Sequence, residues 1–228
     1  MASVPSFLIP AGESQRLSSI RRYEVMQTLQ DDVFSGFVTL TARIFGVPIS
    51  LLALVDEAQV WYHANYGLPH VHDQPREEAL CATAILNDYT VVYHDLDHEL
   101  PPVVTAEAAA AARAKALRFY AAAPVCTPDQ ALVGSICVID RQPRAFNAGE
   151  QRLLKHIASL ISQLIAAAPA GPWPAIRALV QDELQSLGAL VRYIVSRHGT
   201  QVPVSPEMLV LLGRRLFDLS EGVAALAH

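Results

Sequence analysis

Two apolar runs, residues 118–125 and 132–140, limit most strongly what this chain can fold into. The connector between them contains Pro128 and Asp129, a pair that favours a type I turn, so the runs predict a β-hairpin. The second run is apolar at successive positions, which is typical of a strand covered on both faces. We therefore expect this hairpin in the middle of a sheet. Gly134 within it predicts the close approach of another backbone or of a ligand.

Further strands are expected at residues 49–56, 59–67 and 90–96, where apolar and β-branched residues lie between turn signals. The first two are separated only by a short connector, so they should pair antiparallel. Strict alternation along the second would place Trp61, His63 and Asn65 on one face and Tyr62, Ala64 and Tyr66 on the other.

Helical spacing of apolar residues predicts a long helix from Ser14 to about Phe45, which Gly36 and the Asp31–Asp32 pair can bend or interrupt. Between the strands, a loop over residues 68–73 should lead into a helix at 76–86 with Pro75 in its first turn. Two more helices are expected, one at 107–116 opened by Thr105, and one that starts at a capping box of Asn147 and Glu150.

A proline-rich break at residues 169–174 indicates a boundary between a domain at 14–168 and an extension at 174–228. The extension contains two helical patterns, 176–198 and 206–227, each with one apolar stripe. Two such helices cannot bury both stripes well alone, so we expect them to pack on something else.

The composition narrows the class of protein. Hydrophobic residues make up 52% and charged residues 17%, which is globular, and the net charge of -5 argues against a nucleic-acid surface. No apolar stretch reaches the ~18 residues of a membrane span, and the start lacks the pattern of a secretory signal, so a cytoplasmic protein is expected. The three cysteines, Cys81, Cys126 and Cys137, lack metal-knuckle spacing and are expected as buried thiols.

Five pieces of residues 76–144 together resemble the GAF domain of bacterial sensory proteins. They are Leu80-Cys81-Ala82-x-Ala84-Ile85, Val91-Val92-x-x-Asp95, Arg118-Phe119-Tyr120-Ala-x-Ala-Pro124, Gly134-x-x-Cys137-Val138-Ile139-Asp140 and Pro143-Arg144. The resemblance covers about residues 14–167. It implies an α+β fold with a PAS-like antiparallel sheet of five or six strands, flanked by helices, with the C-terminal helices as an appendage.

The resemblance also implies a pocket between one sheet face and the helices at 76–86 and 107–116. The residues expected in it are Trp61, His63, Cys81, Ala84, Tyr93, Arg118, Tyr120 and Cys137. The first and last domain helices would lie together on the other face, commonly as a dimerisation surface. With the tail, they lead us to expect a homodimer.

Three functions remain open on the sequence. The first is a non-catalytic sensory module that binds a small molecule of unknown identity and signals through helical association to an output partner such as a histidine kinase. The second is a thiol enzyme like the GAF-type free methionine sulfoxide reductases, and the third is an interaction module without a ligand. No covalent bilin is expected, because none of the three cysteines is followed by histidine. No metal site is expected either, since the histidines at 70–72 and 94–98 are read as solvated surface.

Overall fold

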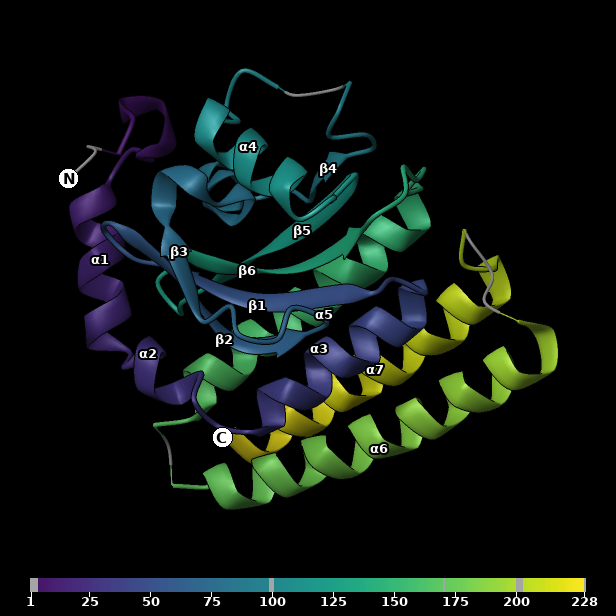
Figure 1. The fold of residues 1–228 in the computed structure, drawn as a ribbon. Coiled ribbons are helices and arrows are strands. Elements are labelled where there is room, and N and C mark those ends of the chain that lie inside the picture. The colour runs from purple at the N-terminus through teal and green to yellow at the C-terminus, as the bar shows by residue number, and fades with distance from the viewer. Residues whose placement is uncertain (1–3, 99–100, 170, 200–202, 228) are drawn as a thin grey trace.

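The structure, a computed structural model, describes residues 4–98, 101–169, 171–199 and 203–227. Its centre is a six-stranded antiparallel sheet in the order β3-β2-β1-β6-β5-β4 (Figure 1). The strands are β1 (Ile49–Val55), β2 (Gln59–Tyr66), β3 (Asp73–Pro75), β4 (Val91–Tyr93), β5 (Phe119–Cys126) and β6 (Leu132–Asp140). The α-helices are α1 (Glu13–Arg22), α2 (Val25–Thr28), α3 (Val33–Phe45), α4 (Ala106–Ala114), α5 (Ala148–Ala167), α6 (Trp173–His198) and α7 (Pro206–Ala227). Short 3₁₀ helices are η1 (Ser6–Leu8), η2 (Arg76–Glu78) and η3 (Leu80–Leu86). The expected α+β class, the six-stranded sheet and the C-terminal helices are confirmed.

The β5–β6 hairpin lies where the sequence predicted. Strand β6 pairs with β1 on one side and β5 on the other, and its interior residues are buried. The Pro128–Asp129 turn is closed by a bond from the Gln130 amide to the Thr127 carbonyl, 2.9 Å long. A Cβ at Gly134 would lie 2.0 Å from the carbonyl oxygen of Ala53 on β1. Close approach of a neighbouring backbone therefore explains this glycine.

The helical pattern expected over residues 14–45 is interrupted, as expected at the Asp31–Asp32 pair and also at Glu24. The chain forms α1, α2 and α3 instead, because Glu24 adopts a left-handed backbone with φ of 49° and the Asp31–Asp32 pair starts a new helix. Asp31 is also drawn into tertiary bonds, since its carboxylate accepts from Arg177 of α6 at 3.0 Å. Gly36 does not break the helix. It lies inside α3, where an added Cβ would approach Leu184 of α6.

A bulge in β2 changes which residues share a face. The register with β1 shifts between Leu52 and Ala53, which pair with Ala64 and Tyr62 respectively, so His63 has no partner across the ladder. An extra residue in one strand reverses the alternation beyond it. Tyr62 consequently packs in one apolar layer and Ala64 in the other, contrary to the expectation that they share a face.

Residues 73–86 also differ from expectation. Residues 73–75 are not a loop end but the short edge strand β3, which pairs with β2. The α-helix expected at 76–86 is replaced by η2 and η3, separated by Ala79 in an extended conformation. The cause lies in Arg76, which is buried and bonded outside its own segment.

Arg76 anchors the N-terminal segment to the sheet. It is 1% exposed, and its guanidinium donates to the Glu13 carboxylate and to the Leu8 carbonyl, each at 2.6 Å. Arg16 donates to Glu13 as well and to the Val55 carbonyl. Burial raises the pKa of Glu13, but the bonds from the two arginines outweigh it and hold this pKa below the usual 4.5.

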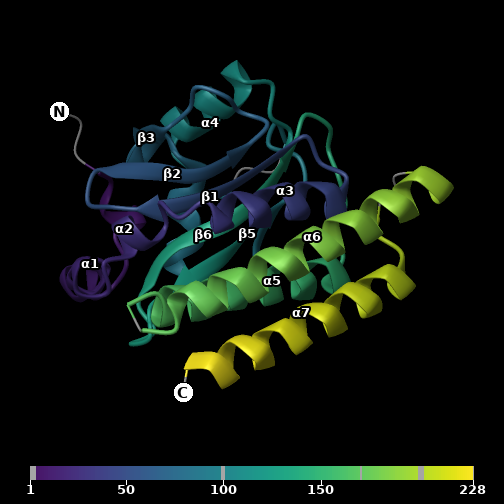
Figure 2. The ribbon, with the colours of Figure 1, turned by 90° about the horizontal axis from the view of Figure 1, so that it is seen from below.

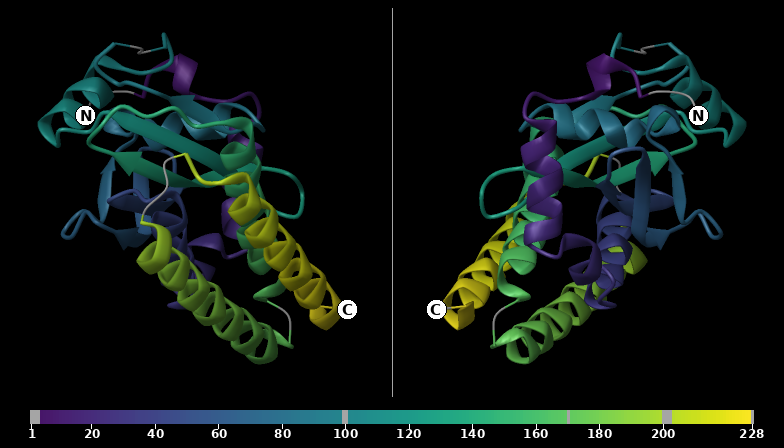
Figure 3. Two further views of the ribbon diagram at one scale, coloured as in Figure 1. Left: turned by 90° about the vertical axis from the view of Figure 1, so that its right-hand side faces the viewer. Right: turned by 90° about the vertical axis from the view of Figure 1, so that its left-hand side faces the viewer.

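Four helices lie on the side of the sheet opposite α4: α3 and α5 contact the strands, and α6 and α7 lie outside them (Figures 2 and 3). Helix α6 packs on α3, α7 packs on α5, and α6 and α7 run antiparallel beside each other. The apolar stripes predicted for the tail are buried in this layer, through Ile176, Val180, Leu184, Leu187, Val191, Met208, Leu212, Leu216, Leu219 and Val223. The tail thus packs on its own chain, where the sequence led us to expect a dimer interface. The break between α5 and α6 covers residues 168–172, close to the boundary expected at 169–174, and Ala170 within it lies outside the described residues. The division into two domains stays a prediction.

A buried ion pair holds the α6–α7 connection against the domain. Glu150, which is fully buried, accepts from Arg144 at 2.5 Å and from the Val204 amide at 3.1 Å. Its other oxygen accepts from the Asn147 amide, which completes the predicted capping box. Arg144 also donates to the Phe45 carbonyl at the end of α3. This pair therefore joins α3, α5 and Val204, two residues before α7 begins.

Candidate functional site

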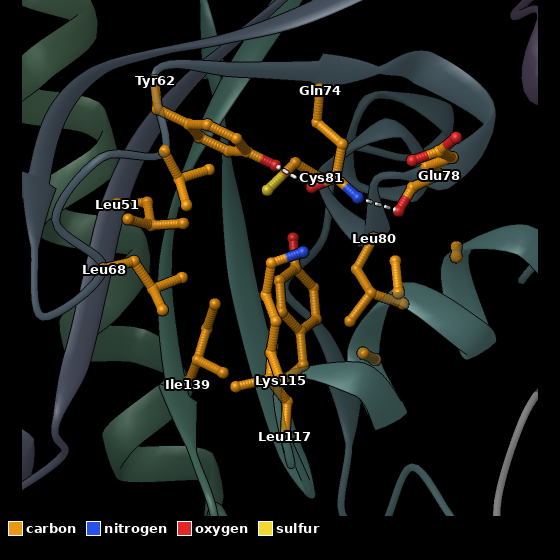
Figure 4. Close-up of a pocket in the computed structure, with 15 residues that line it drawn as sticks. Leu51, Tyr62, Leu68, Gln74, Glu78, Leu80, Cys81, Lys115, Leu117 and Ile139 are labelled. Carbon is orange, nitrogen blue, oxygen red and sulfur yellow. Dashed lines mark hydrogen bonds between the residues drawn. The ribbon is translucent and has the colours of Figure 1, made fainter.

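A small pocket lies between the sheet and the elements η2, η3 and α4, on the face that the four-helix layer leaves free (Figure 4). Its cavity volume is about 40 Å³. The lining residues are Leu51, Tyr62, Leu68, Val71, Gln74, Glu78, Leu80, Cys81, Ala108, Ala111, Ala112, Lys115, Leu117, Tyr120 and Ile139. The resemblance implied a pocket at this position, between the sheet and the helices expected at residues 76–86 and 107–116.

The composition of α4 explains how the pocket is closed. Thr105 caps this helix, since its hydroxyl accepts from the Ala108 amide at 3.0 Å, and the same hydroxyl donates to the Glu77 carbonyl of η2. Ala108 and Ala112 face the sheet, so their small side chains let the helix come close. Lys115 follows the helix and extends back into the pocket (Figure 4).

A few polar groups interrupt the apolar walls. The Tyr62 hydroxyl donates to Gln74 Oε1 at 3.2 Å, and Gln74 Nε2 donates to the Glu78 carbonyl at 2.6 Å (Figure 4). Tyr120 is fully buried, and the structure gives its hydroxyl no hydrogen-bond partner among the described residues. Burial raises the pKa values of Tyr62 and Tyr120 well above the usual 10, so both remain protonated donors.

Two thiols lie together on this side of the sheet. Cys81 belongs to η3 and lines the pocket, while Cys137 lies in the middle of β6 beneath it, and neither is in a disulfide. The neighbouring Cys137 thiol lowers the pKa of Cys81 against the effect of burial, and burial raises the pKa of Cys137. Cys126 is remote from them, because its amide bonds to Ser162 of α5 on the other face.

The structure brings five of the eight expected pocket residues together. Cys81 and Tyr120 line the cavity, and Ala84, Tyr93 and Cys137 belong to the same apolar layer without reaching its wall. Tyr93 stacks on Tyr120 with ring centroids 5.7 Å apart and donates to the Thr83 hydroxyl at 2.8 Å.

The other three expected residues, Trp61, His63 and Arg118, lie outside the pocket. Trp61 packs against the layer of α-helices on the opposite face, and His63 is the unpaired residue of the β2 bulge. Arg118 lies at the surface, where it donates to Asp95 at 2.8 and 2.9 Å. The apolar–polar alternation of β2 gives no sign of a bulge, so the positions of Trp61 and His63 could not be predicted from it. The sequence around Arg118 likewise does not show that its partner is Asp95.

Several pocket residues were missed by the sequence reasoning. Tyr62 was placed on the wrong face because of the bulge, and Gln74 was assigned to a connection before a helix. Lys115 lies at the end of an ordinary alanine-rich helix, where a lysine is expected to point to solvent. The one sequence feature that could have indicated Lys115 as a pocket residue is its position at the end of the predicted helix, close to the start of the next strand.

The polar segments of residues 70–73 and 94–98 form no metal centre in the described part of the chain, which holds no group of three or more His, Cys, Asp or Glu side chains placed to bind a metal. His98 instead pairs with Asp95 at 2.9 Å, and His94 is bonded to the Arg144 carbonyl. Among the residues described, no helix is both long and apolar enough to cross a membrane.

Comparison with protein families matches residues 26–166 to the GAF domain. The chain belongs to the GAF domain family. This match covers more than half of the chain and agrees with the resemblance found over residues 14–167. The GAF domain includes the sheet and helices α3 to α5, while α6 and α7 lie beyond it.

The chain is similar to parts of several known proteins. The chain is 31% identical over 157 residues, 67% of its length, to the cyclic di-GMP phosphodiesterase PA2567 of Pseudomonas aeruginosa, of which it spans only 25%. Among solved structures it is similar to the cyanobacteriochrome receptor PixJ, with 17% identity, a TM-score of 0.50 and coverage of 61% of this chain and 96% of that one. The GAF domain of an Acinetobacter phosphoenolpyruvate-protein phosphotransferase gives 20% identity and a TM-score of 0.49 over 68% of this chain and 95% of that one. The likeness to PixJ is one of fold.

Proposed function

We propose that this GAF domain is a non-catalytic sensory module that binds a small molecule in the pocket between the sheet and η2, η3 and α4. The observation that supports it is the convergence of polar groups from separate elements on an apolar cavity, the usual design of a ligand site. Tyr62, Lys115 and Tyr120 would meet a ligand that is mostly apolar and carries a carbonyl or acidic group.

The volume of the cavity sets a condition on this proposal. A typical ligand pocket is about 300–1,000 Å³, whereas this cavity is about 40 Å³. Binding therefore requires α4 to move away from the sheet and to carry Lys115 outward with it, to the wall of the widened pocket. Ala108 and Ala112 bury little apolar area against the sheet, so moving α4 away from the sheet costs little free energy.

The same volume favours a second candidate, the interaction module whose pocket is filled by its own side chains. Under this reading Lys115 and Tyr62 occupy the space permanently, and no metabolite stabilises the protein. The two candidates differ in whether α4 can open, so a measurement of ligand binding separates them.

A thermal-shift screen of the full chain with a metabolite library tests the proposal. Ala111 lines the pocket and is partly exposed, so Ala111→Trp would close its mouth. Ala110 is exposed on the same helix and does not line the pocket, so Ala110→Trp is a matched control. We expect a compound that raises the melting temperature of the wild type and of the control but not of Ala111→Trp. Absence of any such compound would support the interaction module.

The lack of catalysis is part of the proposal. Cys81 and Cys137 are 2% and 0% exposed, and a nucleophilic thiol needs access to its substrate. Reduction of free methionine sulfoxide by the purified protein, lost in Cys81→Ser, would replace the sensory reading with the thiol-enzyme reading.

The output would pass through helices at the surface of the domain. Helix α1 is bonded to η2 at the pocket edge through Glu13 and Arg76, so movement at the pocket reaches the N-terminal segment. We propose a homodimer, with the outer face of α7 contributing Val210 and Phe217, which are 72% and 59% exposed, and a signalling protein such as a histidine kinase as the output partner. Light scattering of the full chain and of Phe217→Glu tests this, and a monomer for the wild type would exclude the homodimer.

A further inference from the structure

A second cavity, of about 570 Å³, lies between the C-terminal parts of α3 and α6, on the side of the sheet away from the small pocket. The two helices lie side by side and run in the same direction, because Asp31 is bonded to Arg177 near their starts and a Cβ added at Gly36 would meet Leu184 further along (Figure 1). The volume is within the range of about 300–1,000 Å³ that is typical of ligand pockets. The apolar walls are formed by Ala42, Val47, Pro48, Tyr66, Val191 and Val195.

Two arginines lie at this cavity without an acidic partner. Arg43 of α3 and Arg192 of α6 line it, and both also line an adjoining groove of about 400 Å³ between the same two helices. The guanidinium of Arg192 lies over its own helix at the seam, since a Cβ added at the buried Gly188 would be 3.4 Å from its Nη1 atom. Within the part of the chain that the structure describes, neither arginine forms an ion pair.

The helix ends do not account for this pair of arginines. A helix C-terminus carries about half a negative charge, so two of them supply about one negative charge against two positive ones. The carbonyls at the end of α3 are already satisfied, because that of Ala42 accepts from the Val47 amide at 3.0 Å and that of Phe45 accepts from Arg144. Arg192 lies before the last turn of α6. A surplus of positive charge therefore remains beside the apolar walls.

We propose that this cavity binds a small amphiphilic phosphate monoester, with the phosphate between Arg43 and Arg192 and the apolar part along the walls. Guanidinium groups donate paired hydrogen bonds to phosphate oxygens, and a phosphate monoester carries a charge of about −1.5 to −2 at pH 7, which matches two arginines. Arg43 lies within the GAF domain and Arg192 beyond it, so the bound anion would hold the end of α6 against the domain. This site is separate from the pocket of the proposed function and does not depend on it.

Isothermal titration calorimetry of the full chain with octyl phosphate tests the proposal. Octanol, which lacks the charge, and inorganic phosphate, which lacks the apolar chain, are the comparators. We expect one site per chain and an affinity for octyl phosphate at least roughly tenfold above that for either comparator or for octanoate. Arg43→Gln and Arg192→Gln should each weaken binding roughly tenfold or more, because each removes charged hydrogen bonds. Arg197→Gln is the matched control, since Arg197 is exposed on α6 outside the cavity, and it should bind as the wild type does.

Two further variants separate this site from the small pocket and from an effect on folding. Ala111→Trp, which closes the small pocket, should retain the binding of octyl phosphate. Arg192→Glu gives Arg43 an acidic neighbour, so it should abolish binding without lowering the melting temperature. The proposal is overturned if octyl phosphate does not bind, if octanol or octanoate binds as tightly, if Arg192→Glu retains binding, or if Arg197→Gln or Ala111→Trp loses it.

Discussion

Replacing Glu150 with glutamine should destabilise this protein far more than a change of one charge at its surface. The side chain of Glu150 is 0% exposed and that of Arg144 is 3% exposed. Glu150→Gln preserves size and shape but leaves the Arg144 guanidinium buried without its counter-ion. Removing one partner of a buried pair costs about 3–5 kcal/mol of unfolding free energy.

The effect should be visible in both thermal and denaturant unfolding. At about 2–4 °C per kcal/mol for a chain of this size, the melting temperature should fall by roughly 6–20 °C. Glu183→Gln is the matched control, because Glu183 also pairs with an arginine, Arg215, at 2.8 Å, but at the surface between α6 and α7. An exposed pair contributes at most about 1 kcal/mol. If Glu150→Gln costs no more unfolding free energy than this control, the buried pair does not hold the tail to the domain.

Two further changes test the packing of the sheet and the anchoring of the N-terminal segment. Gly134→Ala forces a Cβ against the Ala53 carbonyl, so it should lower the unfolding free energy by about 3 kcal/mol or more, or prevent folding. As the control, Gly213→Ala adds a Cβ that meets nothing within 4 Å and should stabilise α7 by about 0.5–1 kcal/mol. Equal stability of the two variants in urea unfolding would contradict the β1–β6 packing. Because the folded-state pKa of Glu13 lies below its unfolded value of about 4.5, its contribution to stability is present above that pH and is lost as pH falls through the folded pKa. Unfolding free energies measured from pH 6 to pH 3 should thus show Glu13→Gln less stable than the wild type at pH 6, with the two converging at low pH, and a constant difference would exclude the ion pairs with Arg16 and Arg76.

Much of the fold could be predicted from the sequence because its strongest signals are local. The turn at Pro128–Asp129, the cap at Thr105 and the capping box of Asn147 and Glu150 depend on nearby residues, and all three are formed. The glycine at 134 was also interpretable, since a central strand leaves few other reasons for it. These features need no knowledge of which segments meet in space.

The failures share a tertiary cause. Arg76 is drawn into bonds with Glu13 and Leu8, and Asp31 into bonds with α6, so residues 76–86 and 14–45 do not follow their helical periodicity. The bulge at His63 reverses the alternation of side chains along β2. As a result Tyr62 lies at the pocket, where Trp61 was expected. For the site, the resemblance to the GAF domain identified Cys81 and Tyr120, which lie in η3 and β5. Lys115 and Gln74 reach the pocket only through the packing of α4 and the edge strand β3.

Native mass spectrometry of freshly purified full-length protein tests the central claim most directly, because a bound ligand appears as an added mass. The sensory account predicts a chain that retains one small non-covalent molecule, released on activation in the gas phase, and predicts its loss in Ala111→Trp but not in Ala110→Trp. A spectrum with only the unliganded mass, both as purified and after incubation with the metabolite library, would contradict it.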